Sequence, residues 1–197
     1  MVEKRPSTGS RREWASVMQS LAIIVTGLPA SGKTGLGIAV AKALSLPCLD
    51  KDVFLEALFD EYGVGDQDWR QKLSRQADQQ FSHAALDCEA AVLISHWRPP
   101  GLERTGTPTD WVVENFENVI EVWCACAPEI AAKRFVARTR HAGHLDTHRE
   151  AAEIHSWMTA LAPHYPLALG PIVTASTETP TGLEPIIAEI NRLIGRA

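Results

Sequence analysis

The sequence predicts a three-layer α/β domain built on a five-stranded parallel sheet. The first indication is residues 21–26 (LAIIVT), a continuous apolar run typical of a strand that is buried on both faces. The second is the alternation of such runs with helical patterns along the chain, which favours βαβ units with right-handed crossovers. The third is a glycine-rich turn at residues 27–32, between the first strand and a helix expected at 33–45.

The remaining strands are predicted from short apolar runs that end in polar loops. They are expected at residues 47–50, 90–94, 119–124 and 171–174. Helices are predicted where apolar residues recur every three or four positions or where a helix-starting residue precedes the segment. Asp66 suits an N-cap and Pro128 the first helical position. Further helices are expected at 52–60, 66–89, 129–140 and 147–162, with a loop at 141–144. A last helix is expected to open with the capping box Thr181–Glu184 and to run to about residue 194.

The chain is expected to form a single domain from residue 21 to residue 197, because it contains no internal repeat and no second apolar core. Residues 1–20 are interpreted as an N-terminal extension. The first ten of them are polar and expected to be disordered, whereas Trp14, Val17 and Met18 indicate a short helix packed on the domain.

The composition excludes several classes of protein. With 197 residues, 45% of them hydrophobic, the chain can bury a substantial core. A net charge of −5 argues against a sequence-independent nucleic-acid binder, which usually carries a basic surface. No apolar stretch approaches the ~20 residues that span a bilayer, and no signal-peptide pattern is visible, so we expect a soluble protein.

The four cysteines are scattered along the chain, and unpaired thiols favour a cytoplasmic location. Cys48 and Cys88 stand alone. Cys124 and Cys126 lie two apart in a strand-like run with no second pair nearby, so we interpret them as buried small apolar residues rather than a metal or redox site.

The glycine-rich turn matches the phosphate-binding pattern G-x-x-x-x-G-K-[ST] in full. Glycines allow the backbone to wrap around phosphates with its N–H groups pointing inward, and the following helix adds the positive end of its dipole. Lys33 is expected to reach the β- and γ-phosphates and the Thr34 hydroxyl to ligate Mg²⁺. The candidate nucleotide-binding residues are Gly27, Leu28, Pro29, Ala30, Ser31, Gly32, Lys33 and Thr34.

This segment resembles the P-loop kinases that phosphorylate small molecules, among them shikimate kinase, gluconate kinase, chloramphenicol phosphotransferase and the zeta-toxin group. The resemblance covers roughly residues 21–175, with sharp motifs in four short stretches. It implies the P-loop fold with strand order 2-3-1-4-5, a helical lid at about 130–150, and ATP with Mg²⁺ as the phosphate donor.

Two acids, Asp50 and Asp52, close the second strand. The carboxyl ends of parallel strands face one crevice, so these carboxylates should lie near the γ-phosphate. In the family that the segment resembles, an acid here handles the acceptor. Asp52 is our candidate for the base that accepts the hydroxyl proton, and Asp50 for the Mg²⁺ shell. The alternative, that Asp52 only caps the next helix, remains open.

The loop after the third strand begins at Ser95, where P-loop enzymes often carry an acid that organises Mg²⁺. This departure leaves Asp50 as the preferred substitute. The loop resembles the acceptor-side loop of the small-molecule kinases. We expect His96, Trp97 and Arg98 to supply a hydrogen bond, a stacking face and a charge to the acceptor. The alternative places Trp97 in the core and Arg98 in a surface ion pair.

Basic residues then cluster where the resemblance implies a lid. Arg134 and Arg138 are four apart, so on a helix they would share a face. Arg138 is our candidate for stabilising charge on the transferring group, Arg134 for contacting the nucleotide, and Arg140 and His144 for contacting the acceptor. His141 is expected to hydrogen-bond the loop or to contact the acceptor, and the loop bond is open for His144 as well. A merely solvated charged face is the alternative.

Together these features predict an ATP- and Mg²⁺-dependent kinase acting on a small hydroxylated molecule. A nucleoside or nucleotide kinase, or a kinase of an antibiotic, would share the architecture. A nucleotide-dependent switch or binding module is the alternative from another class, although a switch needs no acid to activate an acceptor. The sequence lacks the guanine-reading pattern N-K-x-D, which favours ATP over GTP, and leaves the acceptor open.

Overall fold

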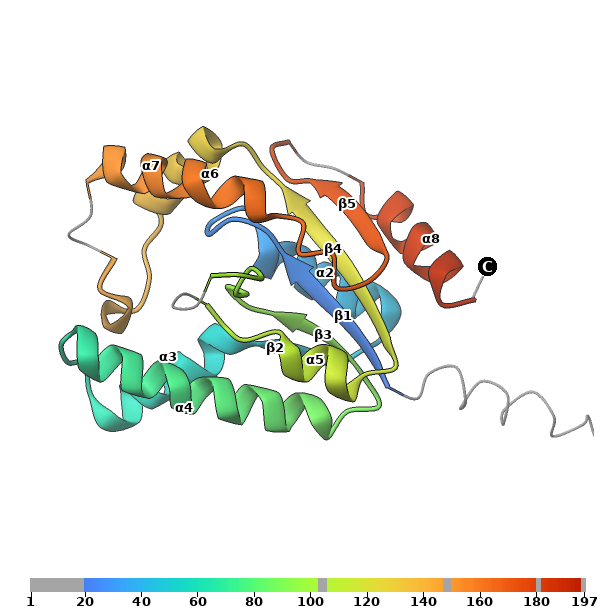
Figure 1. Ribbon diagram of the computed structural model, residues 1–197, viewed down its shortest axis with the longest axis horizontal. Coiled ribbons are helices and arrows are strands. Elements are labelled where there is room, and N and C mark those ends of the chain that lie inside the picture. The colour runs from blue at the N-terminus through green and yellow to red at the C-terminus, as the bar shows by residue number, and fades with distance from the viewer. Residues whose placement is uncertain (1–19, 103–105, 147–149, 180–181, 196–197) are drawn as a thin grey trace, which may run out of the picture.

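The computed structural model describes residues 20–102, 106–146, 150–179 and 182–195. Five parallel strands form one sheet in the order β2-β3-β1-β4-β5, as the sequence predicts. The strands are β1 Leu21–Thr26, β2 Cys48–Asp50, β3 Ala90–Ile94, β4 Asn118–Ala125 and β5 Ile172–Ser176. The carboxyl ends of these strands therefore share one edge of the sheet, seen at the left of the molecule in Figure 1.

Helices cover both faces of the sheet (Figure 1). They are α2 Lys33–Leu44, α3 Lys51–Tyr62, α4 Gln67–Leu86, α5 Asp110–Asn115, α6 Pro128–Ala137, α7 Ala151–Leu161 and α8 Glu184–Leu193, with 3₁₀ turns η1 Ala142–His144 and η3 Ala162–His164. No helix in the described part of the chain is both long and apolar enough to cross a membrane.

Alternate side chains of β1 divide the core into two layers, because successive residues of a strand point to opposite faces. Ile23 and Val25 pack in a cluster with residues of α2 and α8. Ile24 packs in the other cluster with Phe81 of α4 and Met158 of α7. All six residues of β1 are buried, which explains the continuous apolar run in the sequence.

The segment that follows α6 differs most from the expectation. The helix ends at Ala137, and Arg138 is extended (φ −80°, ψ 145°). The prediction of a helix to residue 140, with Arg134 and Arg138 on one face, is therefore wrong. The loop expected at 141–144 contains the 3₁₀ turn η1. The next helix begins at Ala151 rather than 147, and residues 147–149 lie outside the described ranges.

Short elements account for the other differences. Helix α5 was not predicted, since six residues are too few to show a helical period. Helix α3 begins at Lys51, and its N-cap is Asp50, whose side chain accepts a hydrogen bond from the Asp52 amide. The capping role considered for Asp52 thus belongs to Asp50. The predictions for residues 1–19, including the helix near Trp14, and the Thr181 end of the capping box lie outside the described residues.

Candidate active site

The phosphate-binding loop joins β1 to α2 and has the conformation that its glycines allow. Gly27 and Gly32 have φ of 130° and 99°, which L side chains rarely adopt. A Cβ at Gly27 would lie 2.7 Å from the Cys124 carbonyl oxygen, so a larger residue would displace β4. Ala30 also has positive φ (59°), and the amide of Ser31 donates to the Leu28 carbonyl at 3.1 Å. The loop is therefore a tight, preformed turn above the sheet.

Lys33 lies across this loop. Its ammonium donates to the carbonyl oxygens of Gly27 (3.0 Å) and Leu28 (2.8 Å). Burial lowers the pKa of Lys33 to about 8, the Asp52 carboxylate opposes the shift, and the nearby Arg138 guanidinium adds to it. Arg138 and Asp52, which lie far apart in sequence, thus act in opposite directions on the pKa of Lys33.

Thr34 and Asp50 are brought together at the start of α2 and the end of β2. The Thr34 hydroxyl donates to Asp50 Oδ2 at 2.9 Å. Burial raises the pKa of Asp50, although the hydrogen bond from the Asp52 amide partly opposes the rise. Two oxygen donors side by side at the phosphate-binding loop fit Mg²⁺, which prefers oxygen ligands and is commonly held by one or two protein groups together with phosphates.

Asp52 faces the lid, the segment 138–146 that descends from α6 toward α3 (Figure 1). Its Oδ2 forms a very short ion pair with Arg140 Nη2. Burial acts to raise the pKa of Asp52, but Arg140, His144, Lys51 and Lys33 together outweigh burial, so the pKa of Asp52 is lowered. Asp52 is therefore held as a carboxylate, the form that accepts a proton.

Arg138 and Arg140 share a second carboxylate. Arg138 Nη2 and Arg140 Nη1 each lie 3.1 Å from Asp146 Oδ2. The Arg138 guanidinium also stacks on the Phe135 ring, 4.1 Å from the ring centre. Both terminal nitrogens of Arg140 thus bind aspartates, and its predicted contact with the acceptor stays a prediction.

Two histidines dock the lid on α3. His144 lies 2.8 Å from Glu56, and His141 lies 3.2 Å from Asp60. The Phe59 ring stacks on His141 and meets His144 edge-on, with centroid distances of 5.3 and 5.6 Å. The His144 side chain is 1% exposed, so it is part of a packed interface rather than an open pocket wall.

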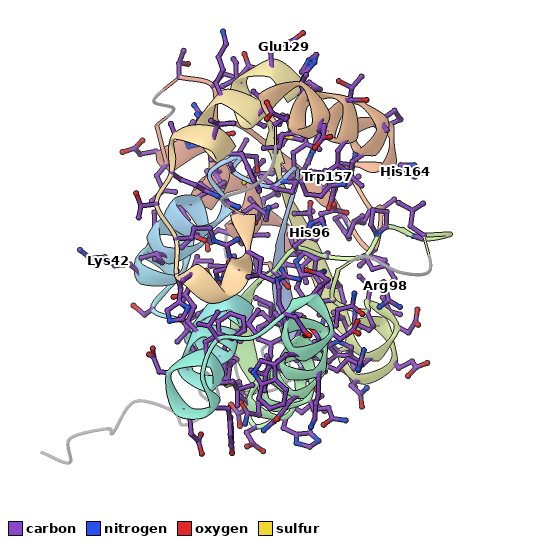
Figure 2. The ribbon with its side chains drawn as sticks, turned by 90° about the vertical axis from the view of Figure 1, so that its left-hand side faces the viewer. Lys42, His96, Arg98, Glu129, Trp157 and His164 are labelled. Atoms are coloured by element: carbon purple, nitrogen blue, oxygen red, sulfur yellow. The ribbon has the colours of Figure 1, made fainter. Side chains whose placement is uncertain are left out.

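The loop after β3 contributes His96 to the crevice but not Trp97. Trp97 has no exposed surface, and its Nε1 donates to the Val25 carbonyl at 3.0 Å. The predicted stacking face is therefore buried, and that assignment is wrong. Figure 2 shows His96 in the middle of this face beneath Trp157, with ring centroids 6.1 Å apart. Burial, together with the cations Lys33 and Lys51, lowers the pKa of His96 to about 3, so the ring is neutral.

Ser95 and Arg98 are turned to structural contacts. The Ser95 hydroxyl lies 2.6 Å from that of Thr107, which donates in turn to Asp78 at 2.7 Å. Because the Thr107 proton goes to Asp78, Ser95 must be the donor to Thr107. Arg98 Nη2 donates to the Gly106 carbonyl at 3.2 Å, and Figure 2 places Arg98 below and to the side of His96.

Lys51, which belongs to none of the sequence motifs, is a buried cation next to the candidate base. Its ammonium lies 2.7 Å from Ser74 Oγ and 3.3 Å from Asp78 Oδ1, both on α4. Burial lowers the pKa of Lys51, and Asp78 opposes the shift. The only sequence signal is its place between Asp50 and Asp52.

Arg134 lines a cavity of about 430 Å³ beside the phosphate-binding loop. Its Nη2 donates to the carbonyls of Thr177 (2.7 Å) and Glu178 (3.2 Å), in the segment after β5. Gly32 lines the same cavity. Arg134 therefore lies on the α8 side of the loop, away from the Arg138–Asp146–Arg140 cluster.

The cysteines form no disulfide among the described residues. Cys124 is buried as expected, Cys88 and Cys126 are half-buried, and Cys48 is exposed. Burial raises the pKa of Cys124 to about 12, so it remains a thiol. The described residues also contain no group of three or more His, Cys, Asp or Glu side chains placed to hold a metal ion.

Several solved structures with this arrangement are described as kinases. A protein of Chloroflexus aurantiacus j-10-fl, described as a "putative kinase", matches with a TM-score of 0.74 at 26% identity over 88% of this chain and 98% of that one. This chain has the fold of the P-loop small-molecule kinases. The shikimate kinase of Bacteroides thetaiotaomicron gives a TM-score of 0.58 at 18% identity, over 89% and 98% of the two chains. The gluconokinase of Sinorhizobium meliloti 1021 gives 0.50 at 18%, over 90% and 93%.

No protein-family model and no curated protein matches the sequence. The two neighbours at 18% identity show the fold alone, whereas the Chloroflexus structure, at 26% identity, also bears on activity. The predicted resemblance to P-loop small-molecule kinases and the prediction of an enzyme of the kinase class are confirmed.

Proposed function

We propose that this kinase transfers the γ-phosphate of ATP to a hydroxyl group of a small molecule. The observation that carries the proposal is the pairing of Thr34 with Asp50 at the phosphate-binding loop, with Asp52 two residues further on. A switch protein needs the first pair for Mg²⁺ but has no need of a second, ionised acid beside it. The arrangement therefore favours transfer to an acceptor over hydrolysis alone.

In the proposed reaction the acceptor hydroxyl oxygen attacks the γ-phosphorus in line with the bond to the β–γ bridging oxygen. That bond breaks, ADP leaves with the bridging oxygen, and the hydroxyl proton passes to Asp52. The loop amides and Lys33 hold the phosphates, and Arg138 stabilises charge on the transferring group. Mg²⁺, held through Thr34 and Asp50, would neutralise phosphate charge.

The cavity beside Gly32 fits the nucleoside part of ATP. It opens next to the loop that would hold the phosphates, and the Arg134 guanidinium forms part of its wall. A planar cation is suited to stack on a base. We therefore assign Arg134 to the nucleotide, as the sequence suggested, but through its base rather than its phosphates.

The acceptor is proposed to lie between α3 and the β3 loop, bounded by Asp52 and His96. His96 Nδ1 is buried and has no hydrogen-bond partner among the described residues, which supports a role in binding a polar group of the acceptor. Among the expected acceptor contacts, His96 remains part of the proposal. The cytoplasm, where free thiols persist, is the proposed compartment.

The decisive experiment is a panel of hydroxylated metabolites and antibiotics incubated with Mg·ATP, followed by mass spectrometry for a product that has gained one phosphoryl group. One acceptor should raise ADP release far above the rate with water alone, and the Lys33→Ala variant should abolish the product. Slow ATP hydrolysis that no acceptor accelerates would support the switch instead.

A further inference from the structure

Asp146 is the centre of a chain of charged side chains in the lid. Its Oδ2 accepts from Arg138 Nη2 and Arg140 Nη1, each at 3.1 Å. Arg140 Nη2 in turn pairs with Asp52. One carboxylate thus lies between two guanidinium groups, and one of these reaches the candidate base.

The packed turn η1 sets the position of Asp146. Leu145, in the left-handed region at φ 56°, ends the turn and donates its amide to the Ala142 carbonyl at 3.1 Å. His144, directly before it, is buried against Phe59 and bonded to Glu56. The Asp146 side chain is itself only 22% exposed. The carboxylate is therefore fixed to α3 through the docked turn.

The two arginines need such an anion between them. Burial lowers the pKa of Arg138, the like charge of Arg140 lowers it further, and Asp146 opposes both effects. Phe135 covers one face of the Arg138 guanidinium, and Asp146 takes one edge through Nη2. Arg138 Nε is buried and has no hydrogen-bond partner among the described residues, so this donor remains free to bind an anion such as a transferring phosphoryl group.

We propose that Asp146 is a positioning residue of this site: its carboxylate holds Arg138 toward the transferring phosphoryl group and Arg140 against Asp52. The inference rests on the proposed function, since it assigns the two arginines to the transfer step. It adds that the lid works as one unit, in which a residue outside every motif aligns groups on both sides of the reacting phosphorus.

The test compares Asp146→Asn with the parent and with Glu129→Gln, an acid-to-amide change on the outer part of α6, well away from His96 in Figure 2. Calorimetry measures the affinity for Mg·ADP alone and with aluminium fluoride, a planar mimic of the transferring group. The affinity of Asp146→Asn for Mg·ADP should lie within twofold of the parent's. The factor by which aluminium fluoride raises that affinity should be about tenfold smaller in Asp146→Asn than in the parent. Glu129→Gln should keep the full gain.

A double-mutant cycle separates positioning from general loosening of the lid. Arg138→Gln should lose the same gain, and adding Asp146→Asn to it should cost little more, because the aspartate acts through the arginine. Asp146→Glu, which keeps the carboxylate, should recover part of the gain. Losses that add as for independent sites, or full gain in Asp146→Asn, would overturn the proposal. Should Asp146→Asn melt well below the parent, Asp146→Ser repeats the cycle.

Measurements on the parent protein distinguish a failure of the proposed function from a failure of the role of Asp146. Failure of the parent to bind Mg·ADP, or to gain from aluminium fluoride, would overturn the proposed function and this inference with it. A parent that gains affinity while Asp146→Asn and Asp146→Ser gain equally would leave the proposed function standing and remove only the role of Asp146.

Discussion

Asp52 is the candidate base of the proposed transfer. Its carboxylate is kept ionised by Arg140 and its neighbours, and it lies beside the pair Thr34–Asp50. Asp52→Asn keeps the shape of the side chain but cannot accept a proton. We expect the transfer rate to fall by about 10²–10⁴-fold, with nucleotide affinity changed only a few-fold.

Steady-state kinetics and calorimetry on Asp52→Asn check this expectation, with Glu61→Gln on the exposed side of α3 as the matched change. Equal rates in Asp52→Asn and the parent would remove the residue from the mechanism.

We expect His96 to make the free energy of unfolding depend on pH. Its folded-state pKa is lowered to about 3 by burial and by nearby cations, against an ordinary value of 6.5. Between these values the unfolded chain binds a proton that the folded chain excludes. Stability from this group is therefore complete above pH 6.5 and lost as the pH falls toward 3, at up to about 1.4 kcal/mol per pH unit.

Chemical denaturation of the parent and of His96→Asn at pH 7, 6 and 5 measures this contribution. The two free energies of unfolding should converge as the pH falls, because the variant has no such group to protonate. Parallel curves would show that His96 is protonated as readily in the folded protein as in the unfolded chain.

At the level of elements, the lid and α3 form one interface. Gly143 packs so closely on Phe59 that a Cβ would lie 2.4 Å from the ring. Gly143→Ala should therefore lift the lid from α3. We expect faster trypsin cleavage in the lid, at Arg138 or Arg140, and a lower transfer rate.

The clash itself can be tested by making room for the new methyl group. Phe59→Ala combined with Gly143→Ala should be less sensitive to trypsin than the two single effects predict when added. Gly35→Ala is the control, because no other atom lies within 4 Å of a Cβ at that position. Unchanged cleavage in Gly143→Ala would show that the lid does not depend on this contact.

At the level of the whole molecule, a buried carboxylate joins β1 and β4 to the segment that precedes β5. Glu121 of β4 has no exposed surface and accepts from the Thr26 hydroxyl (2.6 Å) and the amides of Leu167 and Ala168 (both 2.8 Å). In the same region, the Tyr165 hydroxyl donates to the Trp97 carbonyl at 3.2 Å.

Glu121→Gln replaces an accepting oxygen with an amide nitrogen that cannot accept. We expect it to lower the free energy of unfolding by about 1–3 kcal/mol, the cost of leaving a buried donor unsatisfied. Urea denaturation measures the loss against Glu114→Gln, an exposed change. A loss no greater than that of the control would mean that the network rearranges around the amide.

The sequence predicts a feature of this molecule well when the residues that form it lie close together along the chain. The phosphate-binding loop is contiguous, and the sheet order follows from the family resemblance. The proximity of Asp50 to Thr34 follows from the shared edge of parallel strands. Asp146 and Lys51 could not be assigned in this way, because their roles depend on how a lid turns and on how α3 packs against α4.

Trp97 is the opposite case, a residue that the sequence assigned to the site but that the fold buries. An aromatic residue in an acceptor-side loop is compatible with both stacking and burial, and only the path of the chain places its indole under β1. The positions of Arg134 and Arg138 also depend on that path. A helix that ends three residues earlier than expected separates them, one toward the cavity by Gly32 and the other toward Asp146.

Helix α3 carries the candidate base. The same helix contacts the lid through Glu56, Phe59 and Asp60. Substitutions on this helix that change the substrate preference would therefore also change how the lid packs against it. A chimera that imports α3 from another kinase should work only when segment 138–146 is transplanted with it.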